Sequence, residues 1–129
     1  MNVDEDRVGL TLLIVDDDPT FRGLIRALVE AQPETQLVAE AKDGEEAIRL
    51  ARELRPDVVL MDIAMPRVNG LEALRSTKAA MPDTKIVVVT VHGEDVYRRL
   101  ALAGGADAFI LKKALGSDLL PAIRRITSG

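Results

Sequence analysis

Four short runs of apolar residues constrain the fold of this chain more than any other feature of its sequence. Residues 10–15, 58–61, 86–89 and 108–111 are rich in Val, Ile and Leu and do not alternate regularly with polar residues. Runs of this length and composition are typical of strands that are covered on both faces, as in a parallel sheet. Residues 36–41 form a weaker fifth candidate. The pattern therefore predicts five parallel strands with helices on both sides of the sheet.

Amphipathic helical patterns separate these predicted strands. In the first, apolar side chains recur at helical spacing, at Phe21, Leu24, Ile25, Leu28 and Val29. Similar patterns cover residues 43–54, 70–80, 94–103 and 117–126. Asp18 before Pro19, and Asp43, are predicted helix caps. Strands alternating with helices in this way predict the α/β class, with one doubly wound five-stranded parallel sheet of flavodoxin-like order 2-1-3-4-5.

The composition excludes several kinds of chemistry. The 129 residues are enough for one domain, and they include no Cys, one His and only 2% aromatic residues. Disulfides, thiolate zinc sites, two-histidine acid/base pairs and base-stacking surfaces are therefore excluded. A net charge of -4 does not favour direct binding to nucleic acid. Because the sequence has neither a long apolar run nor a signal-peptide pattern at its start, we expect a cytoplasmic protein without a membrane span.

Polar residues follow four of the predicted strands at the point where each strand ends. Asp16, Asp17 and Asp18 follow the first strand, and Asp62 follows the third. Thr90 ends the fourth strand, and Lys112 and Lys113 follow the fifth. In the predicted order these strands are neighbours, and ligand sites in such sheets form beyond the carboxyl ends of the strands. We therefore expect carboxylates, one hydroxyl and one amine to meet in one crevice.

This set of groups fits phosphorylation of an Asp in the presence of Mg²⁺. Several carboxylates close together repel one another, and a hard divalent cation removes the conflict. A carboxylate can attack phosphorus, and the product adds negative charge that needs a cation and a hydrogen-bond donor. Lys112 and Thr90 supply these. Each residue alone is more commonly a cap, a turn residue, a surface amine or a strand residue, but their joint occurrence favours the site.

The segments LLIVDDDP, PDVVLMDIAMPRVNGLEAL, IVVVT and GGADAFILK together resemble the CheY-like receiver domain of two-component response regulators. The resemblance extends from about Leu10 to Ile126, almost the whole chain. Within the family, the pattern from Asp62 to Gly70 is most similar to NarL/FixJ-like regulators, which carry a helix-turn-helix output domain. The resemblance implies a signalling phosphoacceptor, not an enzyme, that assists only its own phosphorylation and dephosphorylation.

The resemblance also implies roles for the acidic residues. Asp62 matches the phosphoacceptor of the family. Asp16 and Asp17 match its acidic pair, and of the two we expect Asp17 to ligate Mg²⁺ directly. Ala64 matches the residue whose backbone carbonyl ligates the metal, so the implied metal site comprises Asp16, Asp17, Asp62 and Ala64. The expected cofactor is Mg²⁺, with Mn²⁺ as a possible substitute.

The same resemblance implies a conformational switch. Thr90 matches the switch hydroxyl, Lys112 the phosphate-pairing lysine and Phe109 the switch aromatic, which turns inward when the hydroxyl moves to the phosphoryl group. A group that gains a contact in only one state can shift a two-state equilibrium. The expected readout face comprises the fourth helix, the fifth strand and the fifth helix. Its candidate residues are Tyr97, Arg98, Arg99 and Leu102.

Three positions depart from the family pattern or lie beside the site. Val91 follows Thr90 where a small residue is usual, and we expect slow autodephosphorylation as a consequence. Lys113 stands where the family often has Pro in a cis bond, so no geometry is predicted for that bond. His92 lies near the mouth of the site, and we expect an exposed loop histidine there.

Two other functions fit parts of the pattern. In a haloacid-dehalogenase-like phosphatase, Asp16 would be the nucleophile and Asp18 the acid/base, in the pattern DxDxT. That family needs a further acidic pair after the lysine, but only Asp118 follows Lys112. It would also leave Asp62 without a role. The second alternative is a receiver-shaped module that is never phosphorylated and acts through protein contacts alone.

The sequence also suggests an organisation and partners. We expect a flexible tail at residues 1–9, a receiver at 10–127 and, at 128–129, the start of a linker to an absent output domain. The implied phosphodonor is a sensor histidine kinase or a phosphotransfer protein. Homodimerisation on phosphorylation follows from the family alone. Contact with DNA is expected only through the absent output domain, although a stand-alone receiver that docks on a partner is an alternative.

Overall fold

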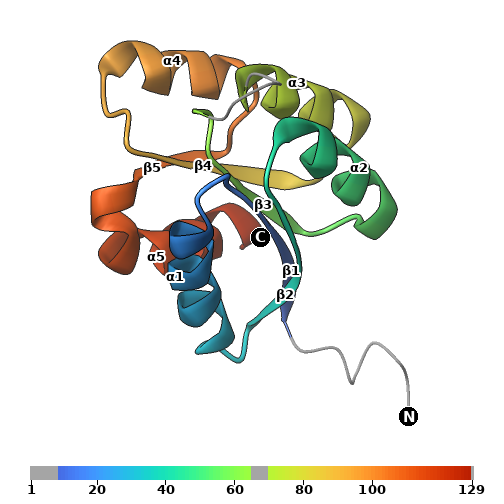
Figure 1. Cartoon of the computed structure of the whole chain (residues 1–129), viewed down its shortest axis with the longest axis vertical. Coiled ribbons are helices and arrows are strands. Elements are labelled where there is room, and N and C mark those ends of the chain that lie inside the picture. The colour runs from blue at the N-terminus through green and yellow to red at the C-terminus, as the bar shows by residue number, and fades with distance from the viewer. Residues whose placement is uncertain (1–8, 65–69, 129) are drawn as a thin grey trace.

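The structure, a computed structural model, describes residues 9–64 and 70–128. The strands are β1 (Leu10–Val15), β2 (Thr35–Ala41), β3 (Val58–Met61), β4 (Lys85–Thr90) and β5 (Ala108–Leu111). The α-helices are α1 (Pro19–Glu30), α2 (Gly44–Leu54), α3 (Gly70–Ala80), α4 (Asp95–Ala103) and α5 (Leu115–Thr127). All strand pairs are parallel, and the order is β2-β1-β3-β4-β5 (Figure 1). The predicted fold class and strand order are confirmed.

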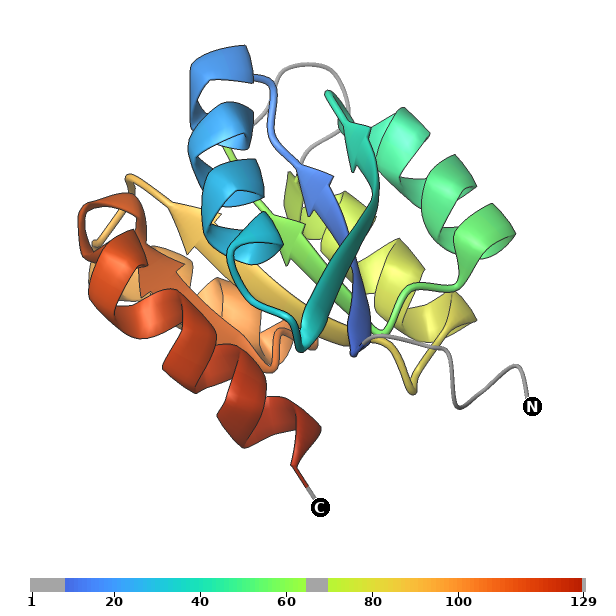
Figure 2. The same ribbon diagram turned by 90° about the horizontal axis from the view of Figure 1, so that it is seen from below.

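Helices cover both faces of the sheet and form a separate apolar core on each. On one face, α1 and α5 pack against Leu12 and Ile14, and on the other, α2, α3 and α4 pack near Leu13 and Val15 (Figures 1 and 2). Successive residues of a strand point to opposite faces. A strand buried on both faces is therefore apolar at every position, which explains the non-alternating runs of the sequence.

The ends of the elements follow the predicted caps in most places. The side chain of Asp18 accepts a hydrogen bond of 2.9 Å from the Thr20 amide, and that of Asp43 accepts one of 2.9 Å from the Glu46 amide. The last helix begins earlier than predicted, at Leu115 after the 3-10 turn η2 (Lys112–Ala114). The apolar pattern missed this first turn because most of its side chains face solvent.

One glycine brings α3 close to the end of β3. A Cβ atom on Gly70 would lie only 2.3 Å from the Cα atom of Ile63, so no larger residue fits there without movement of the backbone. Ile63 follows Asp62 directly, and the close approach therefore holds α3 against the exit of β3. Part of the motif that carried the family resemblance, residues 65–69, lies outside the described residues, as do residues 1–8 of the predicted tail and Gly129 of the predicted linker.

Helix length and composition also bear on the membrane prediction. Within residues 9–64 and 70–128, no helix is both long enough and apolar enough to cross a membrane.

Candidate functional site

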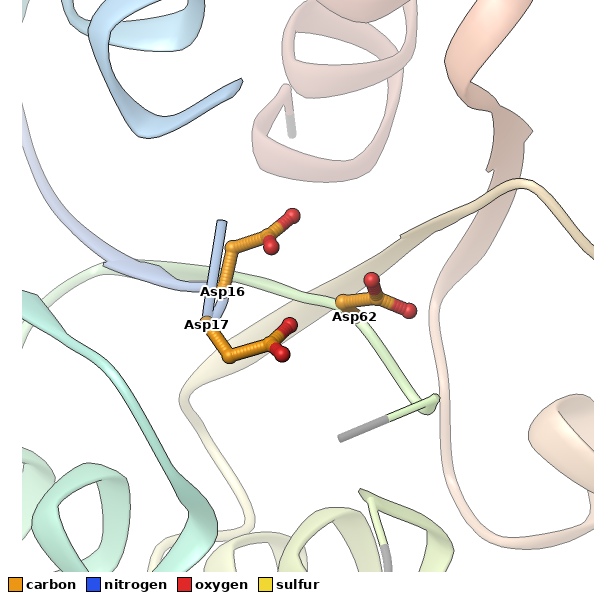
Figure 3. A group of neighbouring side chains, drawn as sticks. All are labelled: Asp16, Asp17 and Asp62. Carbon is orange, nitrogen blue, oxygen red and sulfur yellow. The ribbon is translucent and has the colours of Figure 1, made fainter. Parts of the chain in front are cut away.

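Neighbouring strands bring three carboxylates together at the carboxyl end of the sheet, the end at which all five strands finish. Val15 of β1 pairs with Met61 of β3, so the residues that follow them lie side by side. The Asp62 amide donates a hydrogen bond of 2.9 Å to the Val15 carbonyl. Oxygen atoms of Asp16, Asp17 and Asp62 lie within 4.8 Å of one another. Figure 3 shows the three side chains grouped at this end of the sheet.

Lys112 lies between two of these carboxylates. Its Nζ atom is 2.8 Å from Oδ2 of Asp16 and 3.1 Å from Oδ2 of Asp62. Asp16 and Asp62 are only 1% and 4% exposed, whereas Asp17 is exposed to solvent. The cluster therefore contains three carboxylates and one ammonium group, so negative charge exceeds positive charge there.

Burial acts on the pKa values of both Asp16 and Lys112, which form an ion pair. Burial raises the pKa of Asp16 above its usual value, although the Lys112 ammonium and the Asp18 amide both act to lower it. For Lys112, burial acts to lower the pKa, but its hydrogen bonds to Asp16 and Asp62 outweigh that effect and raise it. Lys112 is therefore a firmly protonated cation, beside a carboxylate whose negative charge is costly to bury.

Backbone amides hold the second oxygen of each buried carboxylate. Oδ1 of Asp16 accepts a hydrogen bond of 2.9 Å from the Asp18 amide, and Oδ1 of Asp62 accepts one of 2.9 Å from the Ala64 amide. Each buried carboxylate is thus held by one amide and by Lys112. The orientation of both groups is fixed in advance, which is how a rigid site holds a metal or a reacting group.

Thr90 reaches the same end of the sheet from β4. It pairs with Leu111 of β5, directly before Lys112, and its side chain is fully buried. Its hydroxyl accepts a hydrogen bond of 3.3 Å from the His92 amide. His92 lies in the loop after β4, as predicted, but it is half-buried rather than exposed. The centroid of its ring is 4.9 Å from that of Tyr97. Val91, in contrast, is 67% exposed.

Phe109 lies half-buried on β5 and packs against the core on the face covered by α2, α3 and α4. The Arg98 guanidinium lies 5.8 Å from the centroid of its ring. Both residues line a surface groove of about 330 Å³ between α4, β5 and α5, together with Pro121 and Arg125. The predicted readout residues are distributed around this region, with Tyr97 half-buried and Arg98, Arg99 and Leu102 exposed.

Among the described peptide bonds none is cis, including the one between Lys112 and Lys113.

From its spacing alone, Phe21 is predicted only as part of the apolar stripe of α1. In the structure, the Nζ atom of Lys112 lies 4.2 Å from the centroid of the Phe21 ring. A cation over an aromatic face is attracted to it, so Phe21 helps to hold Lys112 over the two carboxylates. The only signal in the sequence was its place in the first turn of the helix that follows the three aspartates.

The donor set fits a hard divalent cation. All three side chains offer carboxylate oxygens, which Mg²⁺ prefers, and they lie close enough to share one ion. The exposure of Asp17 leaves one side of the cluster open to water, and Mg²⁺ usually keeps several water ligands. These three carboxylates are among the ligands expected from the sequence, and the fourth, the backbone carbonyl of Ala64, stays a prediction.

Comparison with known proteins places the chain in a family. Residues 12–124 match the family model of the response regulator receiver domain. The chain is 40% identical over 121 residues to the nitrate/nitrite response regulator protein NarL of Escherichia coli (strain K12), a match that covers 92% of this chain and 55% of NarL. It is 41% identical over 121 residues to response regulator GacA of Pseudomonas aeruginosa, covering 93% of this chain and 56% of GacA.

The fold is also similar to a solved structure, that of a LuxR-family two-component response regulator from Aurantimonas. The TM-score is 0.87 at 35% identity, and the match covers 92% of this chain and 84% of that chain. The chain spans about half the length of the curated relatives it matches. The match of the family model over most of the chain confirms the resemblance inferred from the motifs: this chain belongs to the response regulator receiver domain family of two-component signalling proteins.

Proposed function

We propose that this chain is a phosphorylation-dependent switch in which Asp62 accepts a phosphoryl group while Mg²⁺ is bound. The observation that carries the proposal is the cluster of three carboxylates with a single ammonium group at the carboxyl end of the sheet. Asp17, Asp62 and the carbonyl of Ala64 would hold the ion, and Asp16 would lie beside it. The donor would be a phosphohistidine of a sensor kinase or of a phosphotransfer protein.

The reaction needs little movement of the protein. One Asp62 carboxylate oxygen attacks phosphorus, an O–P bond forms, and the bond between phosphorus and the donor nitrogen breaks, leaving the electron pair on the donor. Bound Mg²⁺ supplies positive charge to the phosphoryl oxygens. Lys112 lies 3.1 Å from an Asp62 oxygen and can pair with the new phosphoryl group while it keeps its contact with Asp16.

The switch would begin at Thr90. Thr90 is buried and pairs with Leu111, the residue before Lys112, and its hydroxyl would gain a new acceptor when the phosphoryl group arrives. A contact that exists in only one state shifts the equilibrium toward that state. Movement of Thr90 would give Phe109 room to turn inward, away from Arg98 and from the groove between α4, β5 and α5. That change of surface is the proposed output.

The full regulator would act on transcription. NarL is named as a response regulator, and other relatives are named as transcriptional regulatory proteins, such as DegU of Brevibacillus brevis. We therefore propose that residues 10–127 form the receiver of a regulator with a DNA-binding helix-turn-helix output domain. Phosphorylation would control that domain through the α4–β5–α5 face, with homodimerisation as one form of the response.

Intact-mass measurement after incubation with acetyl phosphate and Mg²⁺ tests the proposal. The wild-type chain should gain one phosphoryl group, Asp62→Asn should gain none, and removal of Mg²⁺ with EDTA should abolish the gain. Label that depends on Asp16 and persists in Asp62→Asn would instead support the phosphatase chemistry. A folded wild-type chain that gains no phosphoryl mass with acetyl phosphate or phosphoramidate would contradict phosphorylation altogether.

A further inference from the structure

An arginine of α1 reaches back to the acidic loop, which comprises residues 16–18 between β1 and α1. Arg22 donates a hydrogen bond of 2.7 Å from Nη1 to the backbone carbonyl of Asp16. Its Nε atom donates a second bond, of 3.2 Å, to Oε1 of Glu40 on β2. The guanidinium is thus held between the edge strand of the sheet and the loop that carries two of the three site carboxylates. None of the roles assigned to the site so far uses this contact.

We propose that Arg22 is a positioning residue for the metal site, an inference that rests on the proposed function. The carbonyl that it holds belongs to the peptide between Asp16 and Asp17. That peptide is planar and contains the Asp17 N and Cα atoms, so holding its carbonyl fixes the point from which the Asp17 side chain leaves the backbone. Arg22 therefore helps to position the exposed metal ligand without touching the metal.

The Asp17 side chain needs a well-positioned backbone because few groups around it hold its carboxylate. Among the described residues, no side chain or amide holds the Asp17 carboxylate by a hydrogen bond, whereas amides and Lys112 hold Asp16 and Asp62. The position of Asp17 thus depends on the backbone of the acidic loop. The Asp16 amide donates a hydrogen bond of 3.0 Å to the Ala41 carbonyl, and Arg22 holds the Asp16 carbonyl.

The chain offers a matched control in Arg26, one turn further along α1. Arg26 binds Glu40 through two hydrogen bonds, of 2.7 and 2.8 Å, so it shares the acceptor of Arg22. It makes no contact with the Asp16 carbonyl. Loss of either arginine removes an ion pair with Glu40, but only loss of Arg22 frees the peptide before Asp17. A difference between the two variants therefore isolates the contact to the carbonyl.

The test compares Mg²⁺ binding by isothermal titration calorimetry in wild-type, Arg22→Ala and Arg26→Ala chains. Groups that orient metal ligands typically contribute 10- to 100-fold in affinity, so we expect Arg22→Ala to weaken Mg²⁺ binding about tenfold. Arg26→Ala should weaken it less than about twofold, since it touches no part of the loop. Both variants should show similar thermal stability, which separates positioning from a general structural effect.

Hydrogen exchange in the metal-free protein provides a readout that does not depend on the ion. Arg22→Ala should speed amide exchange in the acidic loop, and Arg26→Ala should leave it unchanged. Should Arg22→Ala fail to fold, Arg22→Lys keeps the stem and one donor and should still bind Mg²⁺ more weakly than the wild type. Equal affinities in the Arg22 and Arg26 variants would overturn this inference alone. Absence of Mg²⁺ binding by the folded wild-type chain would overturn the proposed function as well.

Discussion

The two ends of the sheet each contain a lysine paired with aspartate, but the balance of charge differs. At the amino end, where the strands begin, Lys78 donates to Oδ2 of Asp107 at 2.9 Å and to the Thr84 carbonyl at 2.8 Å. The Ile86 amide also donates to Oδ2 of Asp107, at 2.8 Å. One ammonium faces one carboxylate here, and the pair joins α3 to the loop before β5.

At the carboxyl end, one ammonium faces three carboxylates. Asp16 and Asp62 share Lys112, and Asp17 has no counter-ion among the described residues. A Lys–Asp pair that is at least half-buried occurs at both ends, so such a pair is not by itself a functional signal. The balanced pair stabilises the fold, whereas the unbalanced cluster stores repulsion that a bound cation can relieve.

The largest effect on stability is expected from the balanced pair. Asp107→Asn keeps the shape of the side chain but leaves the half-buried Lys78 without its counter-ion. We expect the free energy of unfolding to fall by about 2 kcal/mol, measured by urea denaturation. Phosphorylation by acetyl phosphate, measured on the folded variant, should be unchanged. Loss of phosphorylation in a folded Asp107→Asn chain would break the proposed separation between the two ends of the sheet.

The unbalanced cluster should respond in the opposite direction. Asp17→Asn removes one charge from an exposed position that makes no hydrogen bond to the described residues, so repulsion falls and little else changes. We expect the metal-free variant to be more stable than the wild type by about 0.5–1 kcal/mol in urea denaturation.

Mg²⁺ provides the control for this second prediction. Because a ligand that binds only the folded state stabilises it, Mg²⁺ should raise the melting temperature of the wild type. The Asp17→Asn variant should show a much smaller rise, because it lacks the ligand. A destabilised metal-free Asp17→Asn chain would mean that the cluster stores no repulsion.

A third charged cluster, in which two arginines face one carboxylate, has the reverse balance of charge. Glu40 faces both Arg22 and Arg26, and the Arg26 hydrogen bond holds the pKa of Glu40 below its usual value, although partial burial opposes it. A carboxyl group with a lowered pKa in the folded state stabilises the fold above its unfolded pKa. That contribution is lost as the pH falls through the folded pKa.

The corresponding variant is Glu40→Gln. At neutral pH we expect it to be less stable than the wild type by about 0.5–1 kcal/mol. In acid the two proteins should converge, because protonation removes the Glu40 charge from the wild type. The measurement is urea denaturation across an acid-to-neutral pH series. Parallel curves at every pH would contradict a stabilising role for the Glu40 charge.

The sequence was sufficient to predict the fold and the meeting of the site residues. Continuous apolar runs identify strands that are buried on both faces. Because the strands are parallel, their last residues lie at the same end of the sheet. Asp62 and Lys112 could therefore be placed together without coordinates. Local side-chain chemistry also gave the caps at Asp18 and Asp43, because a cap depends only on residues nearby in the chain.

Contacts that depend on the rotation of a helix could not be predicted. The bonds from Arg22 to Asp16 and Glu40 require α1 to turn one particular face to the sheet and to the acidic loop. The pair between Lys78 and Asp107 spans 29 positions and joins two segments whose relative placement is set by the core. The packing of His92 on Tyr97 likewise follows from the path of the loop after β4.

The central claim is that Asp62, in the unbalanced cluster, carries the phosphoryl group. Borohydride reduction of the phosphorylated chain converts an aspartyl phosphate to homoserine, and peptide mass spectrometry then identifies its position. The account predicts homoserine at position 62 and at no other aspartate, and none when Mg²⁺ is removed before the donor is added. Homoserine at position 16 or 17, with Asp62 unmodified, would contradict it.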